Sequence, residues 1–187
     1  LLARVADGLG WLGWRSPLRS TAMAEIAAGV TGDPEPWRLA SGWAPRALED
    51  SLSGMPATVQ ERWFARMFLV KPVAILTLAG FWVATGLITL AAPEAAARVL
   101  SNRGLEPSVA TAIAVGGAIV DVGLGVAVLV RSCLVRAAQG MIAVSLAYLA
   151  GGTLVAPDLW ADPLGPLVKV VPAMALAIVG LAVAEDR

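Results

Sequence analysis

Two ionisable residues, Asp121 and Lys169, lie inside long apolar stretches of the sequence. An acid or a base is costly inside a membrane segment, and by default it indicates a functional site with a partner. The two residues are therefore candidate catalytic or binding groups, either paired directly or bridged by water. The alternative for Lys169 is that its side chain extends to the membrane surface. The alternative for Asp121 is a structural carboxyl that bonds a neighbouring hydroxyl, from Thr77, Thr85, Ser145 or Tyr148.

Tyr148 and Cys133 carry the remaining reactive groups. The Tyr148 hydroxyl is a candidate donor to a quinone carbonyl, although a tyrosine inside a helical bundle is more often a packing residue. Cys133 lies near Arg131 and Arg136, whose positive charges favour a reactive thiolate. Because the sequence offers no second cysteine to resolve an oxidised thiol, an incidental role for Cys133 is the more common outcome.

The absence of histidine limits the chemistry of this sequence. With no histidine and one cysteine, it offers no Cys/His zinc site, no His-ligated haem, no Cys-ligated iron–sulfur cluster and no histidine-activated nucleophile. No metal is therefore expected, and any redox chemistry requires a cofactor or partner from elsewhere. The formal net charge is zero, so the sequence lacks the excess of basic residues that is typical of nucleic-acid-binding proteins.

Composition indicates a membrane protein. Hydrophobic residues make up 58% of the 187 residues and charged residues 15%, whereas soluble domains are about 45–50% apolar. A helix needs about 20 mostly apolar residues to cross the hydrocarbon core of a bilayer. Four segments have about this length, and their short connections predict an all-α, integral membrane four-helix bundle. The predicted spans are residues 72–92, 109–130, 137–156 and 164–184.

The second predicted span has one face of small residues. Gly117, Asp121 and Gly125 are four residues apart and share a row on a helix, beside Ala114 and Ala118. Small residues let a neighbouring helix approach closely, while the bulky opposite face suits lipid, so we predict that Asp121 points toward protein. Two further pairs of small residues predict close helix crossings, Gly80 with Ala84 and Gly123 with Ala127.

The residues before the first span predict a helix that either lies at the membrane surface or, equally, is an amphipathic helix packed on an upstream domain. Thr58 and Glu61 have the spacing of a capping box, whose hydroxyl and carboxylate bond the free amides of the first helical turn. Basic residues are concentrated before span one and between spans two and three. This distribution predicts that both termini lie in the cytoplasm. The residues concerned are Arg62, Arg66, Lys71, Arg131 and Arg136.

Residues 1–57 differ from the rest of the chain. They contain G-x-G-x-x-G at Gly8, Gly10 and Gly13, the spacing of a dinucleotide-binding turn. Because Pro17 ends a helix soon afterwards and the bulky Trp11 lies inside the motif, we interpret it as a chance match in a glycine-rich turn. The segment has too little periodic apolar content for a core of its own. Short helices are predicted at Ser20–Ala28 and between Pro45 and Gly54, separated by a loop at Thr31–Trp37.

Three segments resemble the DoxX-like membrane proteins: GGAIVDVGLGVAVLV from Gly116, Gly151–Met174 and Glu61–Val73. The chain is most similar to members joined to the C-terminal side of an NAD(P)-binding domain of the short-chain dehydrogenase or epimerase (SDR) type. Trp11–Arg19 and Gly32–Arg38 resemble the tail of that domain. The resemblance implies that residues 1–57 are such a tail plus a linker, and that residues 58–187 are a DoxX-like membrane domain.

The resemblance also carries expectations about function. Relatives include a subunit of a thiosulfate:quinone oxidoreductase, which implies membrane redox chemistry with quinone as a partner and NAD(P) bound by the upstream domain. An acid, commonly Glu in the family, occupies the position of Asp121. We therefore expect a membrane module of an NAD(P)-dependent oxidoreductase, which holds that enzyme at the bacterial inner membrane. The fragment alone is expected not to be an enzyme. The alternatives are a passive membrane anchor and, because spans one and three lack a charged relay partner, less favourably a small transporter or proton path.

Overall fold

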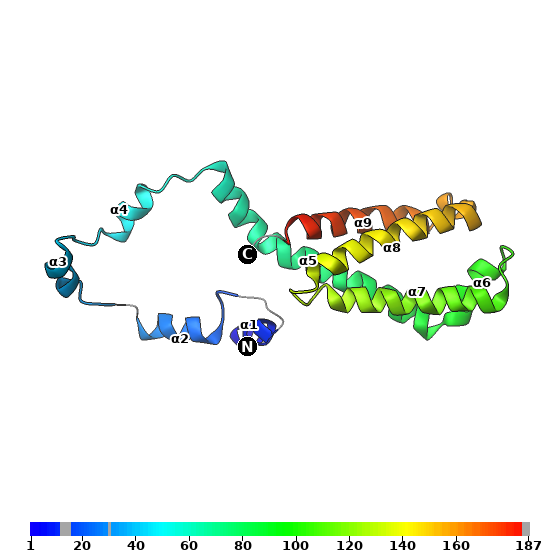
Figure 1. The fold of residues 1–187 in the computed structure, drawn as a ribbon, viewed down its shortest axis with the longest axis horizontal. Helices are drawn as coiled ribbons and strands as arrows, with labels where there is room; N and C mark the ends of the chain where they lie inside the picture. The colour runs from blue at the N-terminus through cyan, green and yellow to red at the C-terminus, as the bar shows by residue number, and fades with distance from the viewer. Residues whose placement is uncertain (12–15, 30, 185–187) are drawn as a thin grey trace. The chain divides into compact units, whose positions relative to one another are not determined.

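The computed structural model describes residues 1–11, 16–29 and 31–184. Within these ranges the chain forms nine α-helices, one 3-10 helix and no strand, so the all-α prediction is confirmed (Figure 1). The chain divides into two compact units, residues 1–68 and 69–187, and the division falls inside α5. The helices are α1 (Leu2–Trp11), α2 (Ser20–Ala28), α3 (Glu35–Ser41), α4 (Leu48–Ser53), α5 (Val59–Ala91), α6 (Pro93–Ser101), α7 (Pro107–Ala127), α8 (Leu134–Val155), η1 (Pro157–Trp160) and α9 (Pro166–Ala182).

The first unit consists of short helices with little buried surface. Among its described residues only Ala6 is buried, while Trp37 and Trp43 are exposed. The α1 and α2 helices are joined by Asp7, whose Oδ1 accepts a hydrogen bond of 3.1 Å from the Ser20 amide and lies 3.6 Å from Arg19 Nε. The α2 helix ends at Gly29 (φ 79°), as its sequence predicts.

The glycine motif near the N-terminus does not form a turn. Gly8 and Gly10 lie inside α1, whereas Gly13 lies outside the described residues. The turn expected from their spacing is therefore wrong for the first two glycines. The physical reason is that α1 is amphipathic, and its hydrophobic periodicity outweighs the cost of about 1 kcal/mol for each glycine in a helix.

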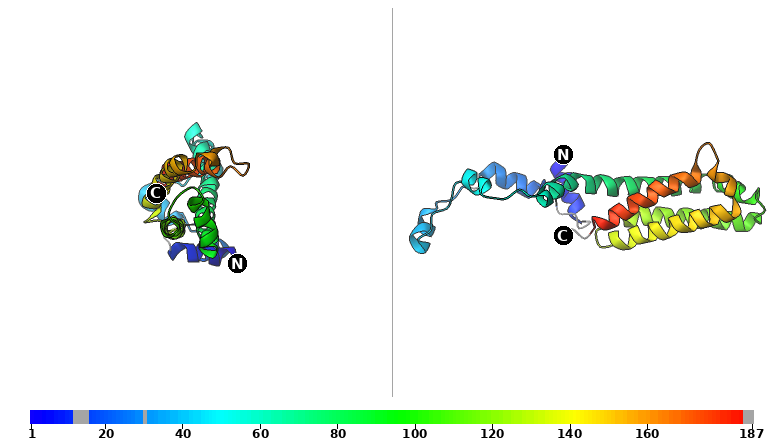
Figure 2. Two further views of the ribbon diagram at one scale, coloured as in Figure 1. Left: turned by 90° about the vertical axis from the view of Figure 1, so that its right-hand side faces the viewer. Right: turned by 90° about the horizontal axis from the view of Figure 1, so that it is seen from above.

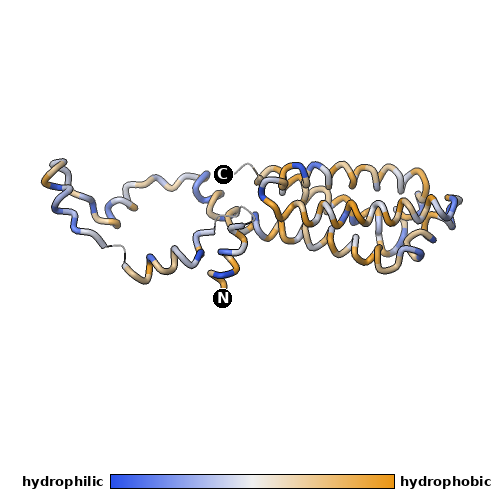
Figure 3. The backbone as a smooth tube through the Cα atoms, turned by 60° about the horizontal axis from the view of Figure 1, so that its bottom comes forward, coloured by the Kyte–Doolittle hydropathy of each residue, from blue (hydrophilic) through white to orange (hydrophobic). Residues whose placement is uncertain are grey.

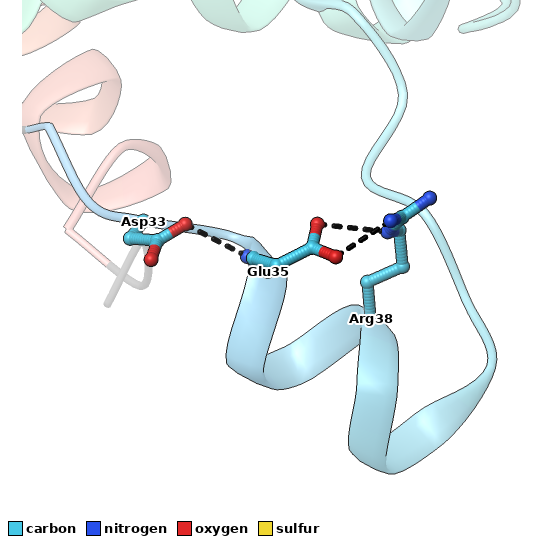
Figure 4. Close-up of polar contacts among 3 residues, drawn as sticks. All are labelled: Asp33, Glu35 and Arg38. Atoms are coloured by element: carbon cyan, nitrogen blue, oxygen red, sulfur yellow. Dashed lines mark hydrogen bonds and ion pairs between the residues drawn. The ribbon is translucent and has the colours of Figure 1, made fainter.

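The α3 helix replaces part of a predicted loop. Residues 31–37 were expected to be irregular, but a helix begins at Glu35 because Asp33 Oδ1 accepts the Glu35 amide at 3.0 Å and caps the first turn (Figure 4). Glu35 then accepts two hydrogen bonds from Arg38, one turn along the helix. The next predicted helix is confirmed in type but begins at Leu48, three residues later than Pro45.

The second unit contains the four predicted apolar segments, each as a helix with shifted ends. The surface helix and the first span form one continuous helix, α5, in which Pro72 is an interior residue. The second span ends early at Ala127, the third begins early at Leu134, and the fourth is shortened to α9. By length and composition, α5, α7 and α8 are long and apolar enough to cross a membrane, whereas α9 has 17 residues. Figure 3 shows hydrophobic residues along most of these helices.

The α6 helix was not predicted. Pro93 occupies its first turn with Glu94, and α6 packs against α7 (Figure 2). Its residue Ala97 is buried. A proline at the first helical position followed by an acid is a helix-start signal, so the sequence contained the necessary information. The connection between the first two apolar segments is therefore partly helical.

Side-chain hydrogen bonds to free backbone amides explain where α5 and α7 begin. Glu61 accepts the Thr58 amide at 2.8 Å and Thr58 Oγ1 accepts the Gln60 amide at 3.2 Å, so the predicted capping box is confirmed. At the start of α7, the Glu106 carboxylate accepts the amides of Ser108 and Val109 at 3.0 Å each. Hydrogen bonds from the Ser108 hydroxyl and these amides lower the pKa of the Glu106 carboxyl.

The α5 and α7 helices make backbone contact through glycine. A Cβ atom added to Gly125 would lie 2.9 Å from the Val83 amide nitrogen and 3.1 Å from the Ala79 carbonyl oxygen. A Cβ on Gly86 would lie 2.7 Å from the Ala118 carbonyl oxygen. The α8 helix packs against both α7 and α9. The α5 helix also contacts α9, where Leu78 Cδ1 would lie 3.1 Å from a Cβ on Gly180.

The small-residue pairs predicted at Gly80 and Gly123 do not form these crossings. A Cβ atom on either glycine would have nothing within 4 Å. Both glycines lie on exposed faces of their helices. Spacing alone identifies which residues share a face, but not which of several small faces meets the neighbouring helix.

Candidate functional site

A cavity of about 470 Å³ lies in the second unit. Side chains of α5, α7, α8 and α9 line it, together with residues of α6 and η1. Most of its lining is apolar, as expected for a pocket that takes a lipophilic small molecule. The polar side chains on its wall are those of Trp82, Thr85, Asp121, Ser145 and Tyr148.

Asp121 lies on the packed face of α7, as predicted. The residue is 8% exposed, and Ala118 and Gly125 on the same face are also buried. On the opposite face, Ile119 and Val126 are more than half exposed. One carboxyl oxygen of Asp121, Oδ2, accepts a long hydrogen bond of 3.5 Å from the Tyr148 hydroxyl. The other, Oδ1, is buried without a hydrogen-bond partner among the described residues.

Gly117 makes space for the Tyr148 hydroxyl. A Cβ atom at this position would lie 2.7 Å from Tyr148 Oη and 3.7 Å from Cζ. Gly117 lies one helical turn before Asp121, so the absence of a side chain there lets the tyrosine reach the carboxyl. The small-residue row therefore serves two neighbours, α5 at Gly125 and Tyr148 at Gly117.

Trp82 is the polar residue that sequence analysis missed. It is 4% exposed and lines the cavity, and its indole Nε1–H has no acceptor among the described residues. A buried tryptophan usually finds a hydrogen-bond partner, and tryptophans of membrane proteins concentrate at the interfaces. A tryptophan in the middle of a predicted span was therefore the available signal.

Of the three other candidate hydroxyls, those of Thr77 and Thr85 are occupied and that of Ser145 is buried. Thr85 donates to the carbonyls of Phe81 and Trp82 in its own helix, and Thr77 donates to Val73. Neither threonine is therefore the partner of Asp121. Ser145 is 2% exposed and lines the cavity beside Tyr148, one turn away on α8.

Lys169 is not part of the cavity. It is exposed on α9, and in the described part of the chain no ion pair joins it to Asp121. The reason is helical periodicity, because Lys169 lies two residues after the buried Leu167 and hence about 200° around the helix. The direct Asp121–Lys169 pair considered from the sequence is therefore wrong. Cys133 also lies elsewhere, at the N-terminal end of α8.

An ion pair connects two segments near one end of the cavity. Arg103, after α6, donates through Nε to Asp158 Oδ1 of η1 at 3.1 Å, and its Nη2 donates to Oδ2. The nearby residues Leu100, Leu105 and Leu159 line the cavity. The Arg103 guanidinium lowers the pKa of the Asp158 carboxyl through these hydrogen bonds.

This ion pair predicts a pH dependence of stability. The folded-state pKa of Asp158 is below its ordinary value of 3.8. The ion pair therefore contributes its full free energy to stability above pH 3.8, and this contribution is lost as pH falls through the lowered pKa. We expect thermal unfolding on acidification to show a larger loss of stability in the wild type than in Arg103→Gln. Arg98→Gln, at an exposed position of α6, should behave like the wild type. Equal acid sensitivity of all three proteins would contradict a stabilising ion pair.

The comparisons with known proteins identify the family. Residues 79–178 match the model of the DoxX-like family. No match was found among curated proteins or solved structures. The matched range covers more than half of the chain and includes every residue that lines the cavity. The chain therefore belongs to the DoxX-like family.

Proposed function

We propose that the second unit is an integral membrane module whose cavity binds a quinone or another lipid-soluble redox molecule. The observation that carries this proposal is the mostly apolar cavity whose wall includes the Asp121–Tyr148 contact and the Trp82 N–H, which has no acceptor among the described residues. A quinone has a flat apolar body and two carbonyl oxygens. Its oxygens accept hydrogen bonds from a donor such as the Trp82 indole N–H.

Membrane insertion as a four-helix bundle is part of this proposal. Contacts link α5 to α7, α7 to α8, α8 to α9 and α9 to α5, which is the arrangement of an antiparallel bundle. Large apolar side chains point away from these contacts, and such exposure is costly in water but suits lipid. The α9 helix, about 26 Å long at 1.5 Å per residue, is at the short end of the range for a span. Examples of the outward side chains are Leu87, Ile88, Ile119, Leu146 and Ile178.

The proposed orientation places the α7–α8 turn and both termini in the cytoplasm. Basic residues flank that side, whereas Arg103 on the other side is neutralised by Asp158. Asp121 then lies six residues from the cytoplasmic end of α7, about 9 Å along the helix axis. A proton from the cytoplasm would therefore have a shorter route to Asp121 than one from the opposite side.

The redox partner in this proposal is an NAD(P)-binding domain of the SDR type preceding the membrane module. The overall reaction would be the oxidation of NAD(P)H by quinone, in which one hydride from NAD(P)H and one proton give quinol and NAD(P)⁺. The chain's own contribution would be to bind and orient the quinone and to exclude water from it. Asp121 would lie where the proton reaches the quinone oxygen.

The test uses the full-length protein in its native bacterial membrane. We expect Asp121→Asn to reduce quinone-dependent NAD(P)H oxidation by about 100-fold, the lower range for loss of a proton-transfer group. Oxidation without added quinone should remain. Glu94→Gln removes an exposed carboxylate of α6 and serves as the control for the loss of charge. Unchanged quinone-dependent rates at equal protein level would show that the module is only an anchor.

A further inference from the structure

The cavity contains one buried donor and one buried carboxyl oxygen that the described residues leave without a partner. The donor is Nε1 of Trp82, which is 4% exposed, and the oxygen is Oδ1 of Asp121, which is 8% exposed. They come from α5 and α7 respectively, and both residues line the same cavity. Buried polar groups are normally hydrogen-bonded, so two exceptions at one cavity indicate a ligand that supplies the missing partners.

The geometry around Asp121 determines which partner it needs. The Tyr148 hydroxyl already donates to Oδ2. With Asp121 ionised, the remaining oxygen can only accept a hydrogen bond and is matched by a ligand hydroxyl, which donates. A carbonyl oxygen has no proton to donate and would bring its lone pairs against those of Oδ1. The Trp82 N–H has the opposite requirement and accepts either a hydroxyl or a carbonyl oxygen as its partner.

The size and polarity of the cavity agree with an organic ligand rather than water alone. A volume of about 470 Å³ is in the range of small-molecule pockets, roughly 300–1,000 Å³, and far above the share of one water molecule, about 30 Å³. Its apolar wall includes Phe81, Ile113, Leu167 and Val170. The ligand must therefore be mostly apolar and carry polar groups for Asp121 and Trp82.

We propose, building on the function proposed above, that the cavity prefers the hydroxyl-bearing, reduced form of its lipophilic ligand, a hydroquinone or a related phenol, over the carbonyl form. A ligand hydroxyl donates to Asp121 Oδ1, and a ligand oxygen accepts from Trp82 Nε1. The reduced form satisfies both groups, whereas the quinone satisfies Trp82 only. Asp121 is thus the specificity-determining residue, and Trp82 is a binding residue that does not discriminate.

The experiment compares a short-tailed hydroquinone with its own quinone, because the two have the same apolar body. Dissociation constants for both are measured with the full chain in lipid nanodiscs. We expect the hydroquinone to bind at least tenfold more tightly, which corresponds to a rise of about 30 mV in the reduction potential of the bound two-electron couple. This ratio requires no variant, so it remains informative even if a substitution impairs folding.

Three variants test which residue makes each of the two proposed contacts with the ligand. Asp121→Ala should weaken binding of the hydroquinone and bring the ratio toward one. Trp82→Phe should weaken both ligands equally. Trp160→Phe is the matched tryptophan control, because the Trp160 indole donates to Thr153 at 3.0 Å and does not line the cavity; it should bind both ligands as the wild type does.

The outcomes separate this inference from the proposed function. Equal binding of the two forms, or tighter binding of the quinone, would overturn the inference while leaving the proposed function intact. Binding of neither form would refute the proposed function itself. A wild-type preference for hydroquinone that persists in Asp121→Ala would also overturn the inference, because the hydroxyl would then be recognised elsewhere.

Discussion

Replacing Gly125 by alanine is expected to lower the stability of the helical unit by about 1–3 kcal/mol, the usual cost of forcing extra volume into a packed site. The added Cβ would lie 2.9 Å from the Val83 amide nitrogen and 3.1 Å from the Ala79 carbonyl oxygen. Both are backbone atoms, so a rotamer change cannot relieve the clash and α5 must move away from α7. Gly86→Ala should act in the same way, because its Cβ would lie 2.7 Å from the Ala118 carbonyl oxygen.

Matched controls exist on the same two helices. Alanine at Gly123 or at Gly80 meets nothing within 4 Å, so these changes should be neutral or stabilising through the better helix propensity of alanine, about 1 kcal/mol. The measurement is denaturant or thermal unfolding of the four variants in one lipid or detergent system. If Gly123→Ala were as destabilising as Gly125→Ala, the close contact between α5 and α7 would be refuted.

The difference between the contact glycines, Gly125 and Gly86, and the exposed glycines, Gly123 and Gly80, also shows which features of helix packing the sequence determines. The four segments were predicted because a long apolar stretch is a strong signal by itself. The packed face of α7 was predicted because it combines small residues with an acid that must avoid lipid. Residues 72–91 of α5 contain no charged residue that distinguishes the face of Gly80 from that of Gly86. The face that meets α7 there depends on the complementary shape of the partner helix.

The candidate site was predicted in part for a similar reason. Asp121 and Tyr148 were identified from chemistry and from their place in the spans, and the structure brings them together. Lys169 was included because of its charge, yet the periodicity around Leu167 places it on the outer side of α9. Trp82 was overlooked because an indole in an apolar stretch counts as hydrophobic. Its importance appears only when the absence of an acceptor for its N–H is known.

Gly117→Ala is expected to displace the Tyr148 hydroxyl from Asp121 and to reduce quinone-dependent activity of the full-length protein about tenfold. The added Cβ would lie 2.7 Å from Tyr148 Oη, so the ring must turn and Asp121 Oδ2 loses its donor. The hydrogen bond is long and half-buried, and a hydrogen bond to a carboxyl contributes about 1.5 kcal/mol, which corresponds to roughly a factor of ten. Gly116→Ala is the neighbouring control, since a Cβ there meets nothing within 4 Å, and it should keep full activity.

A double substitution tests whether the effect of Gly117→Ala acts through this hydroxyl. Tyr148→Phe removes Oη and should by itself cause a similar loss, because Asp121 again lacks its donor. In the Tyr148→Phe background, Gly117→Ala should have little further effect. The nearest remaining ring atom, Cζ, lies at 3.7 Å, an ordinary contact distance. Non-additive losses would therefore place both residues on one interaction, whereas fully additive losses would show that Gly117 acts on something other than the Tyr148–Asp121 contact.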